Sequence, residues 1–284
     1  NYSLGITLFA FVLIGRALFR YINGAGTEVF FYHELATNDI NAIYLSVMVS
    51  IALMYFLVKK RKTFWGYATL LFLFVFILLL SSKVIIGTSI LLIVLYYIFY
   101  SGLTVRGRIT AILMLCLLAG AIGYNGKIKE RIVSEFTYNE AGEQQNGVHM
   151  VTVKEAWTKN NFSASDYLNG TAFRIYQIRI FTEMLQEDPI LFTGYGLNAS
   201  RHKVEEQGIE HNLVHGKDDI VYNKLNFHNQ YVQVFADLGL FGLLLVVVML
   251  IINLKNGFSK KDFVHIAFGF VMISLFLTES FLWR

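Results

Sequence analysis

One histidine of this chain stands where a polar stretch turns into a long apolar run, in the segment LNFHNQYVQVFADLGLFG. His228 opens the run together with Asn229 and Gln230. A neutral imidazole at such a boundary could accept a proton from a hydroxyl group near pH 7, so His228 is a candidate general base. The spacing is also compatible with a polar cap at a membrane interface, and the residues alone leave both interpretations open.

Five basic side chains lie within or beside apolar segments, or on an amphipathic stretch. They are Arg16, Arg20, Lys83, Arg174 and Arg179. Guanidinium and ammonium groups that gather on one side of a membrane would form an anion site that suits a phosphate group. Arg20 and Lys83 also have a structural interpretation, because long basic side chains snorkel to the interface. Acids at membrane depth, such as Asp237 and Glu279, could form structural ion pairs.

The composition places these residues in an integral membrane protein. Of the 284 residues, 55% are hydrophobic and only 15% are charged, whereas soluble domains carry about 25% charged residues. The mean hydropathy is +0.52. This composition excludes a disordered chain and a coiled coil, and the single Cys116 excludes a disulfide scaffold. The net charge is only +4 and the Lys and Arg residues form no basic stripe, which argues against nucleic-acid binding.

Seven apolar segments are long enough to cross a bilayer, which takes roughly 20 residues each. They cover about 2–21, 40–58, 64–82, 84–100, 109–124, 229–253 and 263–281. The predicted fold is therefore all-α, a polytopic bundle of transmembrane helices. We expect five spans in 1–124, one large loop at 125–226 and two spans in 227–284. The chain starts with Asn1 inside an apolar segment, so we expect further spans ahead of it in a longer protein.

The basic residues of the short connections give the orientation. Nine of them lie in three short loops with one acid, Asp262, and they are Lys59, Lys60, Arg61, Lys62, Arg106, Arg108, Lys255, Lys260 and Lys261. Cytoplasmic loops carry such an excess, so these loops should face the cytoplasm. The loop 125–226 holds 11 Lys or Arg against 14 Asp or Glu. We therefore place it outside, with the turn at Ser81, Ser82 and Lys83.

The large outer loop shows internal order. Apolar side chains recur with helical spacing along 171–187, and Pro189 should end that helix. A Gly-Tyr-Gly turn follows at 194–196, and the polar stretches 139–147 and 200–219 are predicted to be exposed loop. Connections of this length are usually functional.

Metal and nucleotide motifs are weak in this chain. His211 and His215 have the i, i+4 spacing of zinc ligands, but they lie in HNLVHGKDD without a glutamate beside the first histidine. The sequence has no HExxH, no CxxC and no glycine-rich phosphate loop. We therefore predict no metal site and no cofactor.

Two segments of the chain carry a family resemblance. RIYQIRIFTEMLQEDPILFTGYGLNAS and, after a polar stretch, FHNQYVQVFADLGLFGLLLVVVMLI resemble the signature of the O-antigen ligase and O-antigen polymerase superfamily. The matching positions are Arg174, Pro189, Gly194, Gly196, His228, Asn229, Tyr231, Asp237, Gly239 and Gly242. Ser82-Lys83 corresponds to a Ser-Arg turn that ends a span in the family. The resemblance covers roughly residues 30–284.

Three positions depart from the family pattern. The stretch YHELATNDINA has His33 but lacks a proline that relatives often carry before the next span. Lys83 replaces the more usual arginine, and Asp237 replaces the more usual glutamate. Lysine lacks the planar fork of arginine, so contact between Lys83 and a phosphate would be looser.

The resemblance implies a GT-C-like, metal-independent inverting glycosyltransferase on the outer face of the bacterial inner membrane. The donor would be a glycan on undecaprenyl pyrophosphate, and the acceptor a sugar hydroxyl on lipid A-core, on another lipid-linked repeat or on a protein. By motif match, His228 would be the general base, while Arg174 and Lys83 would hold the pyrophosphate. The expected substrate-binding set also includes Arg16, Arg20, Arg179, Asn229 and Tyr231.

Two other function classes fit part of the same sequence. A transporter or flippase of polysaccharide precursors would also meet a lipid pyrophosphate, but such proteins tend to carry broken helices and polar sites at the membrane midplane. A scaffold subunit would need neither His228 nor a cluster of cations. Within the enzyme class, polymerase is slightly preferred to ligase, because nothing in the sequence points to a lipid A-core acceptor.

The first prediction concerns topology. With Cys116 replaced by serine, Asn146→Cys should react with a membrane-impermeant maleimide in intact spheroplasts, because the basic short loops place 125–226 outside. Labelling that occurs only after lysis would reverse the orientation of the chain.

Overall fold

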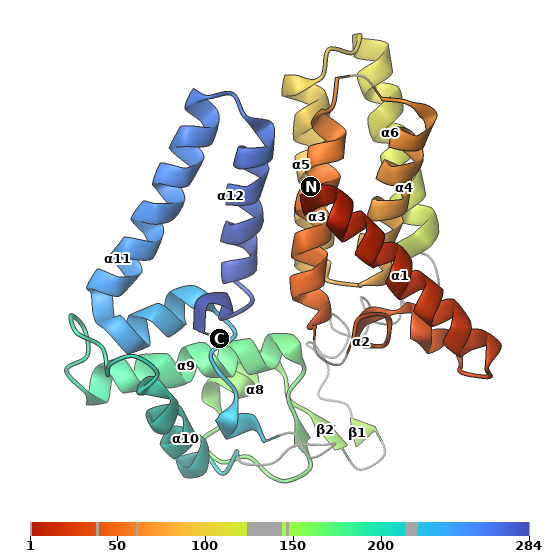
Figure 1. Ribbon diagram of the computed structural model, residues 1–284. Coiled ribbons are helices and arrows are strands. Elements are labelled where there is room, and N and C mark those ends of the chain that lie inside the picture. Colours follow the sequence, from red (N-terminus) through yellow and green to blue (C-terminus); the bar gives the residue numbers. More distant parts are fainter. Residues whose placement is uncertain are drawn as a thin grey trace. The chain divides into compact units, whose positions relative to one another are not determined.

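The computed structural model describes residues 2–37, 40–60, 62–123, 144–145, 148–213 and 221–283. Two compact units make up the chain (Figure 1). The first contains Asn1–Lys129 and Ile251–Leu275, and the second contains Glu130–Leu250 and Phe276–Arg284. His215 and most of the loop predicted at 139–147 lie outside the described residues.

Helices are the regular secondary structure of the first unit's described residues. Its helices are α1 (Tyr2–Ile22), α2 (Tyr32–Leu35), α3 (Ala42–Val58), α4 (Phe64–Leu79), α5 (Lys83–Leu95) and α6 (Val105–Gly123), with a 3-10 turn at Thr27–Phe30 and a π-helical turn at Tyr96–Tyr100. Helix α12 (Phe263–Phe276) lies almost wholly in this unit. The Oγ atoms of Ser50 on α3 and Ser89 on α5 are 2.9 Å apart and hydrogen-bonded. This bond satisfies two polar groups inside an apolar core.

Each of the seven predicted spans contains a helix, but the helices differ in length. Within the described residues, three are long and apolar enough to cross a membrane, at Tyr2–Ile22, Lys83–Tyr100 and Gln230–Ser259. Three further apolar helices are shorter, at Ala42–Val58, Phe64–Leu79 and Phe263–Phe276. The Asn41 and Thr63 side chains accept backbone N–H groups and fix where α3 and α4 begin. Helix α4 ends at Leu79, shortly before Ser81 with its left-handed backbone.

The second unit combines helices with a very small sheet. Its elements are β1 (Gln144–Gln145), β2 (Val148–Met150), α8 (Val153–Thr158), β3 (Asp166–Tyr167), α9 (Gly170–Glu187), α10 (Ser200–Glu210), 3-10 turns at Tyr222–Lys224 and Phe281–Trp283, and most of α11 (Gln230–Ser259). Strand β2 pairs antiparallel with β1 and parallel with β3. The prediction that 200–219 is an exposed loop is wrong in part. Residues Ser200–Glu210 form α10, which buries Val204, Gln207 and Gly208 on one face.

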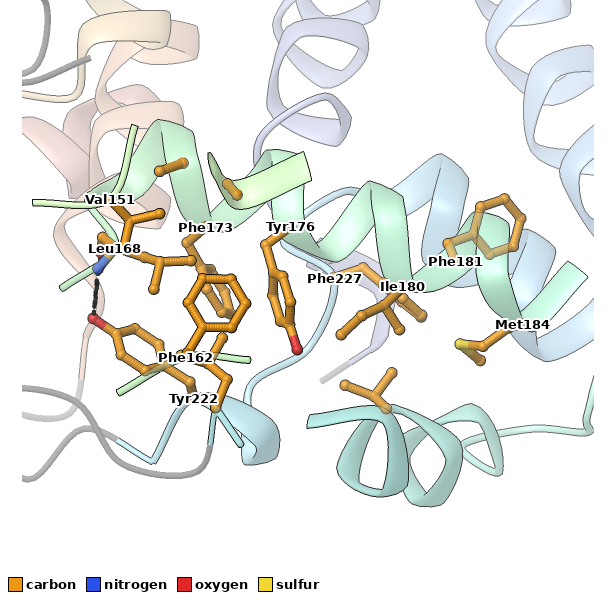
Figure 2. Packing of buried hydrophobic residues seen from close by; sticks show 14 of the residues in the cluster. Val151, Phe162, Leu168, Phe173, Tyr176, Ile180, Phe181, Met184, Tyr222 and Phe227 are labelled. Atoms are coloured by element: carbon orange, nitrogen blue, oxygen red, sulfur yellow. Dashed lines mark hydrogen bonds between the residues drawn. The ribbon is translucent and has the colours of Figure 1, made fainter. Parts of the chain in front are cut away.

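Helix α9 supplies the core of the second unit (Figure 2). Its apolar face carries Phe173, Tyr176, Ile180, Phe181 and Met184, as the periodicity predicted. The Asn169 side chain caps the first turn by accepting the N–H groups of Thr171 and Ala172, and the helix ends before Pro189. Around this face pack buried side chains from distant segments, including Phe162, Tyr222 and Phe227.

A backbone contact breaks α11 close to its start. Gly239 has φ 67° and ψ −165°, which is not helical, and Figure 1 shows the bend. The Gly-Tyr-Gly turn docks at this point, because the Tyr195 N–H donates to Ala236 O and the Leu240 N–H donates to Leu191 O. A Cβ on Gly194 or Gly239 would lie within 3.0 Å of backbone atoms of the opposite segment. Both positions therefore need glycine.

The break also corrects the sequence prediction of an unbroken sixth span. Without proline in this segment, we expected a continuous helix from 229 to 253, and a glycine supplies the break instead. Asp237 lies before it, so this acid belongs to the short first part of α11. The remaining stretch from Leu240 to Ser259 still has the roughly 20 residues that a bilayer crossing takes.

Substitution of the docked glycines should destabilise the protein. Gly239→Ala combines a left-handed backbone with overlap on the backbone of Phe192, so we expect a loss of at least about 1–3 kcal/mol. Gly87→Ala is the matched control, because that helical glycine has nothing within 4 Å of an added Cβ. Thermal unfolding in detergent measures both, and equal melting temperatures would contradict the close backbone approach.

Candidate functional site

His228 lies outside α11, two residues before its first residue Gln230. The sequence had predicted that His228 opens this helix, so that prediction is corrected. The Asn229 Oδ1 accepts the N–H groups of Tyr231 and Val232, so Asn229 is the residue that caps the helix. His228 has a left-handed backbone with φ 47°, and its N–H donates to Asn226 Oδ1 at 3.0 Å. His228 thus lies in a bend of the chain that leads into α11.

The segment that follows α12 packs against the start of α11. The Asn229 N–H donates to Ser280 Oγ at 3.3 Å, and its side-chain amide donates to Leu277 O at 3.4 Å. The Leu282 N–H donates to Gln230 Oε1 at 2.5 Å. Gln230 is therefore buried and structural. These bonds place Glu279 beside the bend that carries His228.

Glu279 lies between two basic side chains of the second unit. Its Oε2 is 3.5 Å from His228 Nδ1, and its Oε1 is 3.6 Å from Arg174 Nη2. The Glu279 side chain is only 5% exposed. A buried carboxylate is costly unless it is paired, so Arg174 and His228 together stabilise its charge.

Arg174 is held in place by α9 and by the segment after α12. Its Nε and Nη2 donate to Thr278 O at 3.4 and 3.2 Å, and its Nη1 donates to Gly170 O at 2.9 Å. About a third of the side chain remains exposed. Phe173, the residue before Arg174 on α9, packs its ring edge-on against the His228 ring with centroids 5.7 Å apart. The structure thus brings together the two residues that the sequence ranked first.

Asp237 is satisfied by hydrogen bonds. Its Oδ1 accepts the Ser200 N–H at 3.3 Å and its Oδ2 accepts the Gln233 side-chain amide at 3.1 Å. Ser200 is the first residue of α10, so the carboxylate lies at a helix N-terminus, where negative charge is favourable. The partners that the structure describes for Asp237 are thus hydrogen-bond donors, where an ion pair was one interpretation of the sequence.

Arg16 and Arg20 of the first unit contact the end of α2. Arg16 Nη2 donates to the carbonyl groups of Leu35 and Ala36. Arg20 pairs with Glu34 at 2.6 Å and also donates to its carbonyl oxygen. These cations cap the C-terminus of a helix, a position that favours positive charge. Lys83 opens α5 directly after the Ser81-Ser82 turn, where Ser81 has φ 54°.

Arg179 lies in the core of the second unit and is 6% exposed. It donates to Glu183 Oε1 at 2.7 Å, to Lys159 O at 2.7 Å and to Asn160 Oδ1 at 2.8 Å. His211 belongs to the same cluster, since its Nε2 is 3.6 Å from Glu183 Oε2. The Arg179 guanidinium is thus hydrogen-bonded to other groups of the protein core.

Tyr231 lies in the first turn of α11, and its ring packs edge-on against Phe276 with centroids 6.1 Å apart. Within the part of the chain that the structure describes, no three His, Cys, Asp or Glu residues are grouped as metal ligands. His211 faces Tyr176 and Glu183, and its proposed zinc partner His215 lies outside the described residues.

A family profile for O-antigen ligase matches residues 67–247, which is more than half of the chain. The chain belongs to the O-antigen ligase family. It is therefore a membrane enzyme of polysaccharide assembly with glycosyltransferase-like activity, and its apolar helices agree with a place in the inner membrane. A search of curated proteins finds no match. Lys83, Arg174 and His228 lie inside the matched range, whereas Glu279 lies beyond it.

Glu279 is the one residue of this candidate site that the sequence did not suggest as part of it. The sequence did contain a signal for Glu279, because an acid near the end of an apolar segment needs a partner that neutralises its charge. The partners could not be found from the sequence, since 104 residues separate Arg174 from Thr278.

His211 should make the fold sensitive to acid. Burial lowers the pKa of His211, with the Glu183 carboxylate opposing this effect, so the folded state favours the neutral imidazole. The unfolded chain then binds more protons below about pH 6.5, and stability falls as the pH decreases. Melting temperatures at pH 7.5 and 5.5 should differ less in His211→Gln than in the unchanged protein. His202→Gln, at an exposed position of α10, is the control, and parallel pH slopes in all three proteins would refute this role.

Proposed function

We propose that this chain transfers a glycan from undecaprenyl pyrophosphate to an acceptor hydroxyl, on the outer face of the bacterial inner membrane. Family membership supports the enzyme class. The observation that carries the proposal is the buried Glu279 carboxylate between Arg174 and His228. One carboxylate thereby orients a candidate base and a candidate phosphate ligand together.

In this proposal His228 is the general base. Glu279 faces Nδ1, which favours the tautomer with its proton on that nitrogen and leaves Nε2 as the basic atom. Serine hydrolases use the same arrangement, in which a buried carboxylate orients the histidine and the histidine accepts the proton. The Phe173 ring and the left-handed backbone restrict the imidazole further, so that little reorganisation is needed during reaction.

The proposed step is a single displacement. The acceptor oxygen forms a bond to the anomeric carbon while its proton passes to His228 Nε2. The bond between that carbon and the pyrophosphate oxygen breaks, and its electron pair leaves with undecaprenyl pyrophosphate. Attack opposite the leaving group inverts the anomeric centre. Because pyrophosphate already leaves readily, positioning and charge stabilisation by fixed cations suffice without a metal ion.

Arg174 is proposed to stabilise the charge on the departing pyrophosphate. Its orientation is fixed by Thr278 and Glu279, and its exposed third can meet a ligand. Lys83 is proposed as a second phosphate ligand. Arg16 and Arg20 are proposed as further substrate contacts, and to bind a donor they would have to give up contacts at the end of α2.

The remaining predicted substrate ligands take supporting roles in this proposal. Arg179 stabilises the core beneath the site, and Asn229 caps α11 behind His228. Tyr231 is kept as a substrate contact at the start of α11. The acceptor distinguishes a polymerase from a ligase: elongation of a second lipid-linked repeat favours the former, and transfer to lipid A-core favours the latter.

Arg174 variants test the phosphate contact. Arg174→Ala should lower glycan transfer tenfold or more, about 1.4 kcal/mol of transition-state stabilisation or more. Arg174→Lys should restore only part of the rate, because lysine cannot bind in a forked manner. Transfer from a purified lipid-linked donor is measured at equal membrane abundance, with the exposed Arg201→Ala as control. Full activity of Arg174→Ala would remove Arg174 from the mechanism.

His228 and Glu279 variants test the base. His228→Gln and His228→Ala should lose about 10²–10⁴ in turnover while donor binding stays nearly intact. Glu279→Gln should lose at least about tenfold, because the carboxamide no longer orients the imidazole or balances Arg174. The exposed His202→Gln and Glu206→Gln are the matched controls. Unchanged turnover in His228→Gln would leave His228 as a helix-start residue only. Loss of donor binding in both His228 variants would make it a binding residue.

A further inference from the structure

The turn that docks on α11 presents apolar side chains outward. Leu191 is 48% exposed, Phe192 is 55% exposed and Leu197 is 80% exposed. The turn itself is well fixed, because the Gly194 N–H donates to Ile190 O and the Tyr195 hydroxyl donates to Asp188 Oδ2 at 2.5 Å. Contiguous exposed apolar side chains on an ordered segment mark a surface that something covers.

This apolar surface continues onto α11. The Phe192 ring packs beside the Phe241 ring, with centroids 6.1 Å apart. Phe241 is itself 67% exposed, and the next turn of α11 exposes Leu244 and Leu245. Since α11 is long and apolar enough to span a membrane, its exposed apolar face is a lipid-facing surface. The turn extends that face without interruption.

Basic residues follow the apolar turn directly. Helix α10 begins at Ser200, and its next residues Arg201 and His202 are exposed. Lys203 pairs with Glu187 and Asp188, so it stabilises the turn from behind. Apolar and aromatic side chains beside exposed cations are typical of segments that lie in a membrane interface, with the cations at the level of lipid phosphates.

We propose that residues 190–197 form a membrane-interface anchor that inserts Phe192 and Leu197 among lipid acyl chains. The occupant of this surface is bilayer lipid, because the surface is continuous with the exposed apolar face of α11. Arg201 lies at the headgroup level of the same leaflet. The anchor fixes the depth at which α11 starts, and therefore the depth of the bend that carries His228. This inference concerns lipid contact and does not rest on the proposed reaction.

A spin label at position 197 tests the anchor. Leu197→Cys is prepared in the full chain with Cys116→Ser, labelled with a nitroxide and reconstituted into synthetic phosphatidylethanolamine and phosphatidylglycerol vesicles. The matched control is Ile209→Cys, another exposed aliphatic position, on the last turn of α10. Both side chains are exposed, so neither substitution should disturb folding. Collision of the label with oxygen, which concentrates in lipid, is compared with collision with a water-soluble nickel chelate.

The ratio of oxygen to nickel collisions should be several-fold higher at position 197 than at position 209. Equal, water-like ratios at both positions would overturn the anchor. Low accessibility to both reagents at position 197 would also overturn it, because that result means that protein covers the turn. Phe192→Cys provides a second reading of the same surface and should follow position 197.

Discussion

The second unit depends on a backbone contact between the Gly-Tyr-Gly turn and the start of α11. Hydrogen bonds from Tyr195 to Ala236 and from Leu240 to Leu191 join two segments that approach too closely for any side chain larger than hydrogen. This contact bends α11 at Gly239, brings the Asp237 carboxylate to the first turn of α10, and holds the apolar turn beside Phe241. The bend that carries His228 is attached to this arrangement through the short first part of α11.

Two buried acids show two ways of tolerating charge in this setting. Asp237 accepts a backbone N–H and a side-chain amide, so its charge is satisfied by hydrogen bonds and a helix N-terminus. Glu279 instead faces two basic groups at 3.5 and 3.6 Å, and both distances leave room for adjustment. The first arrangement suits a structural role. The second suits a role in which the histidine changes its protonation state.

The basic residues divide in the same way. Arg16 and Arg20 donate to carbonyl groups at the end of α2, and Arg179 donates to carbonyl and carboxylate groups inside the core. Arg174 is also anchored, but a third of its side chain stays exposed and its carboxylate partner is shared with His228. Several arginines thus lie beside apolar segments, and Arg174 shares its carboxylate partner with a candidate base.

The sequence by itself determined the helical class, the amphipathic face of α9 and its end before Pro189, because periodicity and caps act over a few residues. It also marked His228, Arg174 and Glu279 as polar groups in unusual places. Only the tertiary structure decided their partners, the break at Gly239 and the helical state of α10, whose weak hydrophobicity hid it. Ion pairs and backbone docking depend on atoms that long-range packing brings together. The Asn229 to Ser280 bond, which spans 51 residues, has no local signal in the chain.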